Sequence, residues 1–393
     1  MRRLLPVLTT AAFAAACSAI PVAAPPTPAQ IESGLLSAAD PSRRMTLAKR
    51  MRHHKVSGVS IAVIDMGRLA WVRGYGSTEA GGEPVTTATL FQAASISKPV
   101  MSVAALKLVE QGRLTLDDDV NRSLVAWQVP ENAFTAQRKV TLRGLLSHSA
   151  GIGVPGFQGY AAGLPLPAIR EVLDGTPPAN SLPVRVVAEP GSAWRYSGGG
   201  SMIAQQLLTD TANQSFAALM HDTVLAPLGM ADSLFIQPLP ASEIPRAARG
   251  HYASGIKLTG GWHSYPELAA AGLWTTPGDL AHLVIELNKA AMGEAGSVLT
   301  PGMAREMLTP QRGRWGLGVA LDGSGAALCY SHEGGNAGYR AFLVGCPGTG
   351  QGAVIMTNSD AGDNLYSEIV RGIAVAYGWP QFQRGHIAES TGE

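Results

Sequence analysis

Residues 91–99, with the sequence FQAASISKP, are the most informative stretch of the chain, because they place Ser95 and Lys98 three positions apart at the start of a predicted helix. The helix is expected to run from Ser95 to Gly112, since Pro99 is tolerated in a first turn and Gly112 ends the helical spacing of apolar residues. Side chains three residues apart lie on one face of a helix. A lysine amine can take a serine proton where burial and the positive end of a helix favour its neutral form. The stretch therefore predicts a nucleophile, Ser95, beside its base, Lys98.

The spacing of serine and lysine is a weak indication by itself. The same spacing occurs at Ser254 and Lys257, in a stretch rich in glycine and threonine that no predicted helix follows. A helix-capping serine followed by a solvated lysine would give the same pattern. A functional assignment of Ser95 therefore depends on the rest of the chain.

Apolar runs near both ends of the chain predict strands. Ser57–Asp65 and Leu69–Tyr75 flank a glycine-containing turn, which is the signature of a hairpin. An amphipathic helix with its apolar face towards a core closes the chain. The later strands and the apolar positions of that helix are Trp315–Leu321, Ala326–Glu333, Tyr339–Cys346 and Ala353–Asn358, then Leu365, Ile369 and Ile373.

Residues 116–265 differ from both ends, because they carry short helical segments separated by proline and glycine clusters. The simplest architecture is α+β, of the α/β sandwich type: one antiparallel sheet built from both termini, flanked by helices, with an inserted all-helical lobe. The domain, residues 41–380, then divides into a sheet lobe of residues 41–115 and 266–380 and a helical lobe between them. The active site is expected where the two lobes meet.

The first 24 residues predict a signal peptide, because two arginines precede an apolar stretch, Leu4–Ala16, that is too short to span a bilayer. Two processing routes stay open: cleavage before Cys17 at a lipoprotein box, or cleavage after Ala24 by an ordinary signal peptidase. Either route predicts an exported protein, in the periplasm or held at the outer membrane or cell surface by a lipid on Cys17. Residues 25–40 are expected to be a linker and residues 381–393 a tail.

Charge and histidine content argue against several classes of function. Lys and Arg number 30 against 29 acidic residues, so the net charge of +1 offers no field for nucleic acid. The nine histidines include no H-E-x-x-H or other ligand spacing, so neither a metal nor another cofactor is expected. The chain also lacks G-x-S-x-G, the nucleophile motif of α/β-hydrolases.

Cys329 and Cys346 lie in neighbouring predicted strands, and a hairpin centred near Ala337 and Gly338 would put them opposite each other. In an oxidising compartment such a pair can form a disulfide. The alternative, two buried cysteines that do not bond, stays open.

Residues 91–99 resemble the active-site segment of the group that contains class C β-lactamases, D-Ala-D-Ala carboxypeptidases and family VIII esterases. The resemblance implies this group's fold, an α/β lobe with an antiparallel sheet plus a helical lobe, over about residues 45–380. Five further stretches are similar to landmarks of the same group and occur in the same order: Leu145–Gly151, Pro227–Met230, Leu273–Leu280, Trp315–Gly318 and Met356–Ser359.

Tyr196, in the stretch Trp194–Gly199, corresponds to the tyrosine of the group's second motif, Tyr-x-Asn. The resemblance implies that Tyr196 shuttles protons together with Lys98. Gly198 stands where the group has asparagine, which is implied to bind the amide side chain of the substrate. Because Gly198 has no side chain, esters are favoured over amides; family VIII esterases often lack this asparagine.

The stretch His332-Glu333-Gly334-Gly335 matches the group's third motif, Lys-Thr-Gly or His-x-Gly, at the end of a predicted strand. The resemblance implies that the backbone N–H groups of Gly335 and of the nucleophile form an oxyanion hole, and the small Gly334 lets the strand edge approach the substrate. His332 is expected beside the lysine and tyrosine, where it would act in a pH-dependent way. Strand alternation predicts that Glu333 points away from the cleft.

These observations predict a serine hydrolase that acts on carboxylic esters through an acyl-enzyme on Ser95. A β-lactamase or a D-amino-acid peptidase or carboxypeptidase, using the same residues, is one alternative. A binding or sensor protein that is acylated at Ser95 without turnover is another. The expected partners are small-molecule ester, β-lactam or peptide substrates, and the oligomeric state stays open.

Overall fold

The computed structural model describes residues 26–36 and 44–379. The predicted signal peptide, the lipid site at Cys17 and the predicted tail lie outside these residues. Among the residues described, no helix has the length and apolar character needed to cross a membrane.

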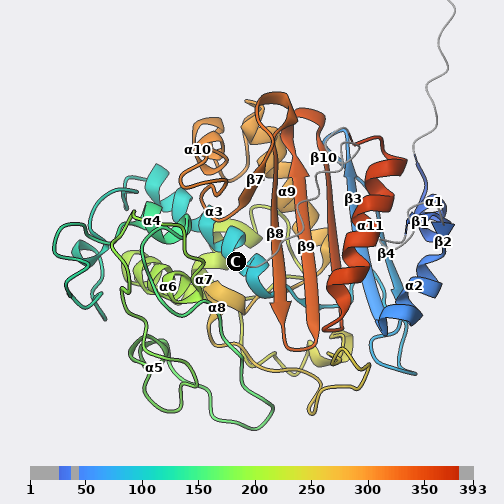
Figure 1. Ribbon diagram of the computed structural model, residues 1–393, viewed down its shortest axis with the longest axis horizontal. Helices are drawn as coiled ribbons and strands as arrows, with labels where there is room; N and C mark the ends of the chain where they lie inside the picture. Colours follow the sequence, from blue (N-terminus) through green and yellow to red (C-terminus); the bar gives the residue numbers. More distant parts are fainter. Residues whose placement is uncertain (1–25, 37–43, 380–393) are drawn as a thin grey trace, which may run out of the picture.

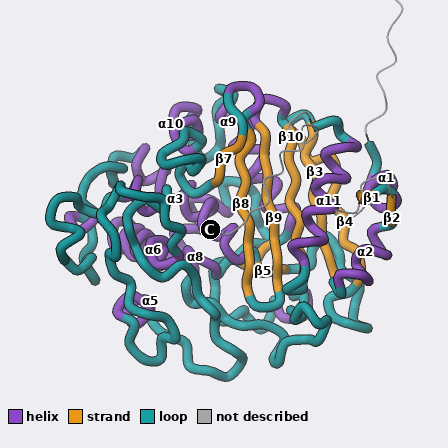
Figure 2. The backbone as a smooth tube through the Cα atoms, viewed as in Figure 1, coloured by secondary structure: helices purple, strands orange, loops and turns teal. Residues whose placement is uncertain are grey.

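A six-stranded antiparallel sheet forms the centre of the molecule (Figures 1 and 2). Its strand order is β4-β3-β10-β9-β8-β7. The hairpin of β3 and β4, from the N-terminal part of the chain, therefore joins the sheet through the pairing of β3 with β10, the last strand in the chain order. The prediction of one sheet built from both termini is therefore confirmed. The strands are β3 (Gly58–Asp65), β4 (Arg68–Gly76), β7 (Ala320–Asp322), β8 (Cys329–Asn336), β9 (Tyr339–Cys346) and β10 (Gln351–Thr357). Two small pairs lie outside this sheet: β1 (Leu35–Leu36) with β2 (Arg44–Met45), and β5 (Phe91–Gln92) with β6 (Trp274–Thr275).

The predicted strand Trp315–Leu321 is wrong in its first part. Trp315 and Gly316 make turn hydrogen bonds, and only Ala320–Asp322 pairs with β8. A Cβ atom added to Gly316 would lie 2.4 Å from the carbonyl oxygen of Met307. The backbone therefore packs closely against the end of a helix here, which the alternation of apolar residues could not reveal.

Helices cover both faces of the sheet, in agreement with the predicted α+β class. Along β3, Ile61 and Val63 face the core beneath α11 (Gly362–Ala376), whereas Ala62 and Ile64 face the core beneath α9 (Pro277–Ala291). Figure 1 shows α11 in front of the sheet and α9 behind it. This alternation is the ordinary result of the two-residue repeat of a strand.

The N-terminal segments pack on the α11 side. Residues 28–36, predicted to belong to a linker, form α1 (Pro28–Ser33) and β1, and both Ile31 and Leu35 are buried in the same core as α11. The next helix, α2 (Leu47–His54), is tied to α11 by a buried ion pair between Arg50 and Glu368.

Between residues 116 and 265 the described chain forms helices and long loops but no strand. Figure 1 shows this part beside the sheet, with α3 at the junction. The remaining helices are α3 (Ser97–Glu110), α4 (Leu142–Leu146), α5 (Ile169–Asp174), α6 (Gly198–Ala212), α7 (Phe216–Met220), α8 (Leu268–Ala271) and α10 (Pro301–Met307). Short helical turns, η1 to η6, lie at Ala94–Ile96, Val120–Arg122, His221–Leu225, Ile244–Arg246, Gly325–Ala327 and Pro347–Thr349.

A disulfide joins Cys329 of β8 to Cys346 of β9, whose Cα atoms are 4.2 Å apart. Tyr330 pairs with Gly345 in the same hairpin, so the two cysteines stand directly opposite each other. Of the two alternatives that the sequence left open, the structure has the bonded one.

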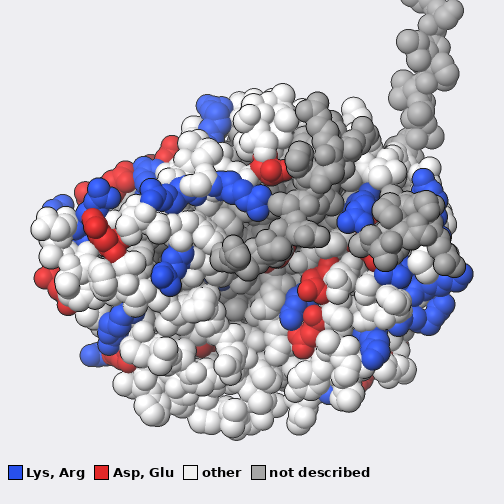
Figure 3. Space-filling view, viewed as in Figure 1, with Lys and Arg blue, Asp and Glu red and all other residues white. Residues whose placement is uncertain are grey.

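Basic and acidic side chains are mixed on the face of the molecule that Figure 3 displays, and much of this face is uncharged. This distribution agrees with the net charge of +1.

Candidate active site

Ser95 lies in the helical turn η1 that leads into α3, not in the α-helix itself. The α-helix begins at Ser97, whereas the sequence predicted its start at Ser95. Ala94 has a φ of 51°, a left-handed conformation that is unusual for a residue with a side chain. The Ser97 hydroxyl donates to the carbonyl of Ala94 at 2.6 Å and accepts from the N–H of Leu273 at 3.1 Å. These bonds hold the strained turn that presents Ser95, and such strain is often found at functional sites.

Lys98 reaches back to the nucleophile from the first turn of α3. Its amine donates to Ser95 Oγ at 3.0 Å and to the carbonyl oxygen of Ala270 at 2.8 Å. The side chain is buried, with 3% of its surface exposed, and forms no ion pair with any described carboxylate. The predicted contact between nucleophile and base is therefore present, at a distance over which a proton can pass between the two atoms.

The ring of Tyr196 lies next to the lysine amine, since Lys98 Nζ is 4.9 Å from the ring centre. Four further rings surround Tyr196, and we call the five together the aromatic cluster. Its members and the distances of their ring centres from that of Tyr196 are His148 (4.4 Å), Trp315 (6.1 Å), His332 (6.3 Å) and Trp194 (6.4 Å). The sequence placed Tyr196 and His332 in the site but missed the two tryptophans and assigned His148 no role there.

His332 is buried on β8 and faces the lysine. Its Nδ1 atom lies 2.6 Å from the carbonyl oxygen of Glu333, and because a carbonyl only accepts, Nδ1 carries the proton. Burial and the charge of Lys98 lower the pKa of His332 to about 3. The ring is therefore neutral at ordinary pH, which contradicts the expectation that His332 responds to pH there.

Glu333 lies on the opposite face of β8, beside Tyr366 of α11. The burial pattern alternates along this strand, with His332 and Gly334 buried and Glu333 and Gly335 exposed. The prediction that Glu333 points away from the catalytic groups is confirmed.

Gly334 allows β8 to approach the nucleophile turn. A Cβ atom added to Gly334 would lie 2.2 Å from the carbonyl oxygen of Ala93, so no other residue fits without movement. In the β8–β9 hairpin, Asn336 and Tyr339 flank a two-residue turn and form a hydrogen-bonded pair. Hydrogen-bonded and non-bonded pairs alternate along antiparallel strands, so the next pair, Gly335 with Arg340, is non-bonded. The N–H of Gly335 therefore points away from β9. Strand β7 pairs with β8 only up to Ser331. The N–H of Gly335 is therefore directed to the open edge of β8, on the side of the nucleophile.

Asn336 fixes this end of β8, a contact that the sequence gave no reason to expect. Its amide donates to Gln92 Oε1 at 2.7 Å and to the carbonyl oxygen of Ala271 at 3.1 Å. The strand, the segment before the nucleophile and α8 are thereby joined through one buried side chain. A buried amide with both bonds made is costly to remove.

Gly198 begins α6, and the space next to it is filled by the loop Val154–Phe157. The N–H groups of Gly198 and Gly199 donate to the carbonyls of Pro155 and Val154, both at 2.9 Å. A Cβ atom added to Gly198 would lie 3.0 Å from a ring carbon of Phe157. The position where the resemblance implies an asparagine is therefore occupied by this loop.

The second serine and lysine pair is not a site. Ser254 and Lys257 lie in an exposed turn, and Lys257 forms an ion pair with Glu79. No helix carries the pair and Lys257 is bonded to a surface carboxylate, so the spacing at this place has no chemical meaning.

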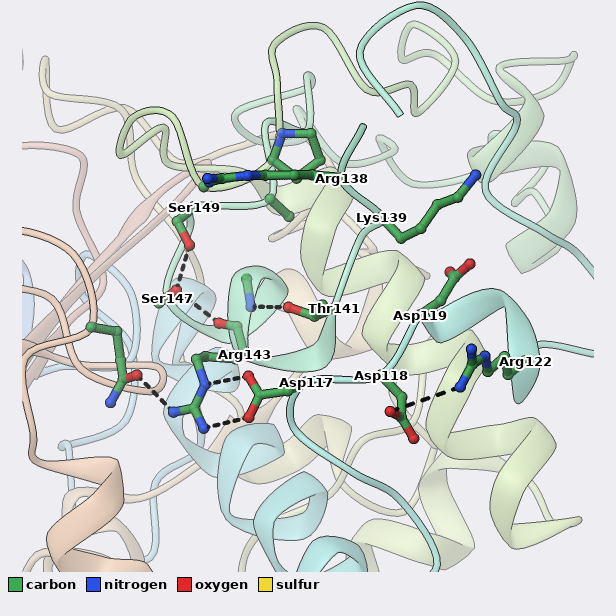
Figure 4. A pocket seen from close by; sticks show the side chains of 15 residues that line it. Asp117, Asp118, Asp119, Arg122, Arg138, Lys139, Thr141, Arg143, Ser147 and Ser149 are labelled. Carbon is green, nitrogen blue, oxygen red and sulfur yellow. Dashed lines mark hydrogen bonds and ion pairs between the residues drawn. The ribbon is translucent and has the colours of Figure 1, made fainter. Parts of the chain in front are cut away.

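A separate pocket of about 500 Å³ lies on the helical lobe and contains none of the predicted site residues (Figure 4). Two ion pairs lie within its lining: Arg143 holds Asp117 through two bonds, and Arg122 lies near Asp118. Within the described residues, no group of three or more His, Cys, Asp or Glu side chains could hold a metal ion.

Comparison with known proteins gives a consistent family. A family model described as β-lactamase matches residues 44–376. Esterase EstB of Burkholderia gladioli is 29% identical over 197 residues, which cover 48% of this chain and 50% of the esterase, so the match spans half of that protein. Penicillin-binding protein 4 of Amycolatopsis lactamdurans is 24% identical over 338 residues, 82% of this chain and 86% of that protein. The solved octameric penicillin-binding protein homologue of Pyrococcus abyssi has the same fold, with a TM-score of 0.70 at 23% identity, over 84% of this chain and 76% of that one.

Proposed function

Because the chain belongs to the β-lactamase family of serine hydrolases, we propose that it hydrolyses carboxylic esters through an acyl-enzyme on Ser95. The observation that carries this proposal is the 3.0 Å contact between Lys98 Nζ and Ser95 Oγ, with the centre of the Tyr196 ring 4.9 Å from the same amine. A nucleophile, a base and a proton carrier are the groups that acyl transfer needs.

In the first half-reaction, Lys98 takes the proton of Ser95 Oγ as this oxygen bonds to the ester carbonyl carbon. The electron pair of the carbonyl moves to its oxygen, and the N–H groups of Ser95 and Gly335 stabilise the resulting oxyanion. When the carbonyl forms again, the bond to the alcohol oxygen breaks. The alcohol leaves with a proton that Tyr196 delivers from the lysine.

In the second half-reaction, water attacks the carbonyl carbon of the acyl-enzyme and gives its proton to Tyr196 and Lys98. The bond between the carbon and Ser95 Oγ then breaks, and the serine oxygen takes the proton back. The products are the acid and the free enzyme, so no cofactor or metal takes part in the proposed steps.

The preference for esters rests on Gly198. An amide-bearing substrate would need a polar side chain at this place to bind its amide, and the loop Val154–Phe157 fills the space instead. An ester with an apolar acyl group needs no such partner. The exposed edge of Trp194 and the ring of Phe157 are apolar surfaces that suit such a group.

A second candidate, action on β-lactams or D-amino-acid peptides with the same residues, is favoured by one observation. The match to penicillin-binding protein 4 covers 82% of this chain, whereas the match to EstB covers 48%. We also propose that the enzyme is exported, because its disulfide suits an oxidising compartment and its first 24 residues have the pattern of a signal peptide.

The test combines labelling of the serine with turnover. Wild type should react with a fluorescent fluorophosphonate and hydrolyse p-nitrophenyl butyrate, and Ser95→Ala should lose both. Lys98→Ala and Tyr196→Phe should each slow hydrolysis by about a hundredfold or more. Lys257→Ala is the matched control, because it removes the lysine of the chance motif, and it should leave the rate unchanged. Hydrolysis that survives Ser95→Ala would refute the mechanism, and labelling of wild type without turnover would favour an acylated sensor.

A chromogenic cephalosporin and a D-alanyl peptide, assayed beside the ester, decide between the two candidates. A kcat/KM for either compound above that for the ester would overturn the preference for esters. The acyl-enzyme mechanism on Ser95 would survive that result.

A further inference from the structure

His148 contacts the segment that carries Tyr196 at three points. Its backbone carbonyl accepts from the N–H of Arg195 at 2.7 Å, and its ring atom Nδ1 accepts from the N–H of Ser197 at 3.3 Å. Between these two bonds its ring packs on the ring of Tyr196, with centres 4.4 Å apart and planes tilted by 42°. Both neighbours of Tyr196 in the chain and its own ring are thus held by one residue.

His148 is itself held in place. Its φ is 57°, a left-handed conformation that few residues with side chains adopt. The flanking hydroxyls of Ser147 and Ser149 lie 2.9 Å apart, and Ser147 also donates to the carbonyl oxygen of Arg143 at 2.7 Å. The segment that carries His148 is therefore anchored to α4.

The bond to Ser197 fixes the protonation of the ring. Nδ1 faces an N–H donor, so it must be without a proton, which places the single ring proton on Nε2. Burial, followed by the charge of Lys98 near it, holds the pKa of His148 well below 6.5. The neutral form that the bond requires is therefore the form present at ordinary pH.

Tyr196 needs such support. Its hydroxyl makes no hydrogen bond to any described residue, so its position depends on the backbone and on ring packing. A small displacement of a proton carrier reduces catalysis strongly, because proton transfer demands hydrogen-bond distances.

We propose that His148 is a positioning residue for Tyr196, acting through the neutral Nδ1 acceptor on Ser197 and through the face of its ring. The inference rests on the proposed function, since it assigns His148 to the proton path of the same reaction. It does not make His148 a catalytic residue, because His148 supports the tyrosine and not the substrate.

Two substitutions separate the acceptor from the ring. His148→Asn keeps an acceptor atom, Oδ1, at the place of Nδ1 and tolerates the left-handed backbone, but it lacks the ring. His148→Leu keeps apolar bulk but offers no acceptor. We expect His148→Leu to lower kcat for p-nitrophenyl butyrate by about tenfold or more with little change in KM, and His148→Asn to recover part of that loss.

The decisive measurement repeats His148→Leu in a Tyr196→Phe background. If His148 acts through the tyrosine hydroxyl, His148→Leu should reduce kcat by less than about twofold in the Tyr196→Phe enzyme, since no hydroxyl remains to be displaced. An equal loss in both backgrounds would show a general structural role and overturn the proposal, as would an unchanged kcat in the otherwise wild-type enzyme.

Two further readouts keep this test independent of the ester assignment. Wild type, His148→Leu, Tyr196→Phe and the double variant are compared in their rate of Ser95 labelling by fluorophosphonate, which needs no ester turnover. Hydrogen exchange of the Ser197 amide, which donates to the ring of His148, should be faster in His148→Leu than in His148→Asn. The Arg195 amide donates to the backbone carbonyl of His148, which both variants keep, and is the internal control. Wild type that labels but does not hydrolyse the ester refutes the proposed substrate, whereas equal exchange of the Ser197 amide in the two variants refutes the role of His148.

Discussion

Replacement of Glu267 by glutamine should change how stability depends on pH. Glu267 directly precedes α8, whose Ala270 carbonyl accepts from the amine of Lys98, and Glu267 is 0% exposed. Burial raises the pKa of this carboxyl from 4.5 to about 7, although its own backbone N–H and the hydroxyl of Tyr160 oppose the shift. Glu267 forms no ion pair with any described residue.

The sign and size of the effect follow from this pKa. Between pH 4.5 and about 7 the folded chain keeps the proton of Glu267 while the unfolded chain releases it, so the free energy of unfolding falls as the pH rises. At about 1.4 kcal/mol per pH unit, the whole window corresponds to about 3 kcal/mol. Below this window both states are protonated, and the glutamine variant should match the wild type.

Urea unfolding at pH 4 and pH 8 measures the difference. Glu267→Gln should be close to wild type at pH 4 and more stable by about 3 kcal/mol at pH 8, because glutamine has no charge to bury. Glu83→Gln, which removes an exposed carboxyl, is the control for a general change of net charge. The same difference between Glu267→Gln and wild type at both pH values would refute the reasoning.

Three further outcomes are expected. Gly198→Asn alone should destabilise the protein and leave the ratio of amide to ester turnover unchanged, because the new Cβ atom meets the ring of Phe157 at 3.0 Å. In a Phe157→Ala background, Gly198→Asn should raise that ratio. A higher ratio for Gly198→Asn alone would contradict the role of the loop. Gly334→Ala should lower the free energy of unfolding by about 1–3 kcal/mol in urea and remove most of the ester activity, since its Cβ atom collides with the backbone of Ala93. Gly335→Ala is the control: the nearest neighbour of its Cβ atom is 3.5 Å away, so it should unfold in urea like wild type. Reduction of the disulfide between β8 and β9, which are linked across 17 positions, should lower the free energy of unfolding by about 3 kcal/mol in a urea titration with and without dithiothreitol; an equal midpoint in both would rule this out.

The parts of the site that local geometry determines could be predicted from the sequence. Ser95 and Lys98 meet because three residues along a helical turn bring side chains to one face, whatever the rest of the fold does. Glu333 points away from His332 because a strand alternates. The hairpin that brings the two cysteines together follows in the same way from two apolar runs and a short turn.

The parts that depend on contacts between distant segments could not be predicted. Trp315 contributes to the aromatic cluster from a turn, whereas the apolar pattern of its segment predicted a strand. His148 and Trp194 come from loops, where no periodicity marks which side chains turn inward. The chain itself shows only that an asparagine is missing at Gly198, whereas the structure shows that Phe157 has taken its place.

The order of the strands has a consequence for how this protein comes to be active. The nucleophile belongs to the first third of the chain, but the strand that faces it, β8, is made in the last fifth, and β3 finds its partner β10 only after that. Ser95 and β8 can therefore meet only after residue 336 has been made, and the long loops to be closed make that step slow. Fragments that end before residue 329 should be inert, so activity itself would report that β8 has been made and has folded against the Ser95 turn.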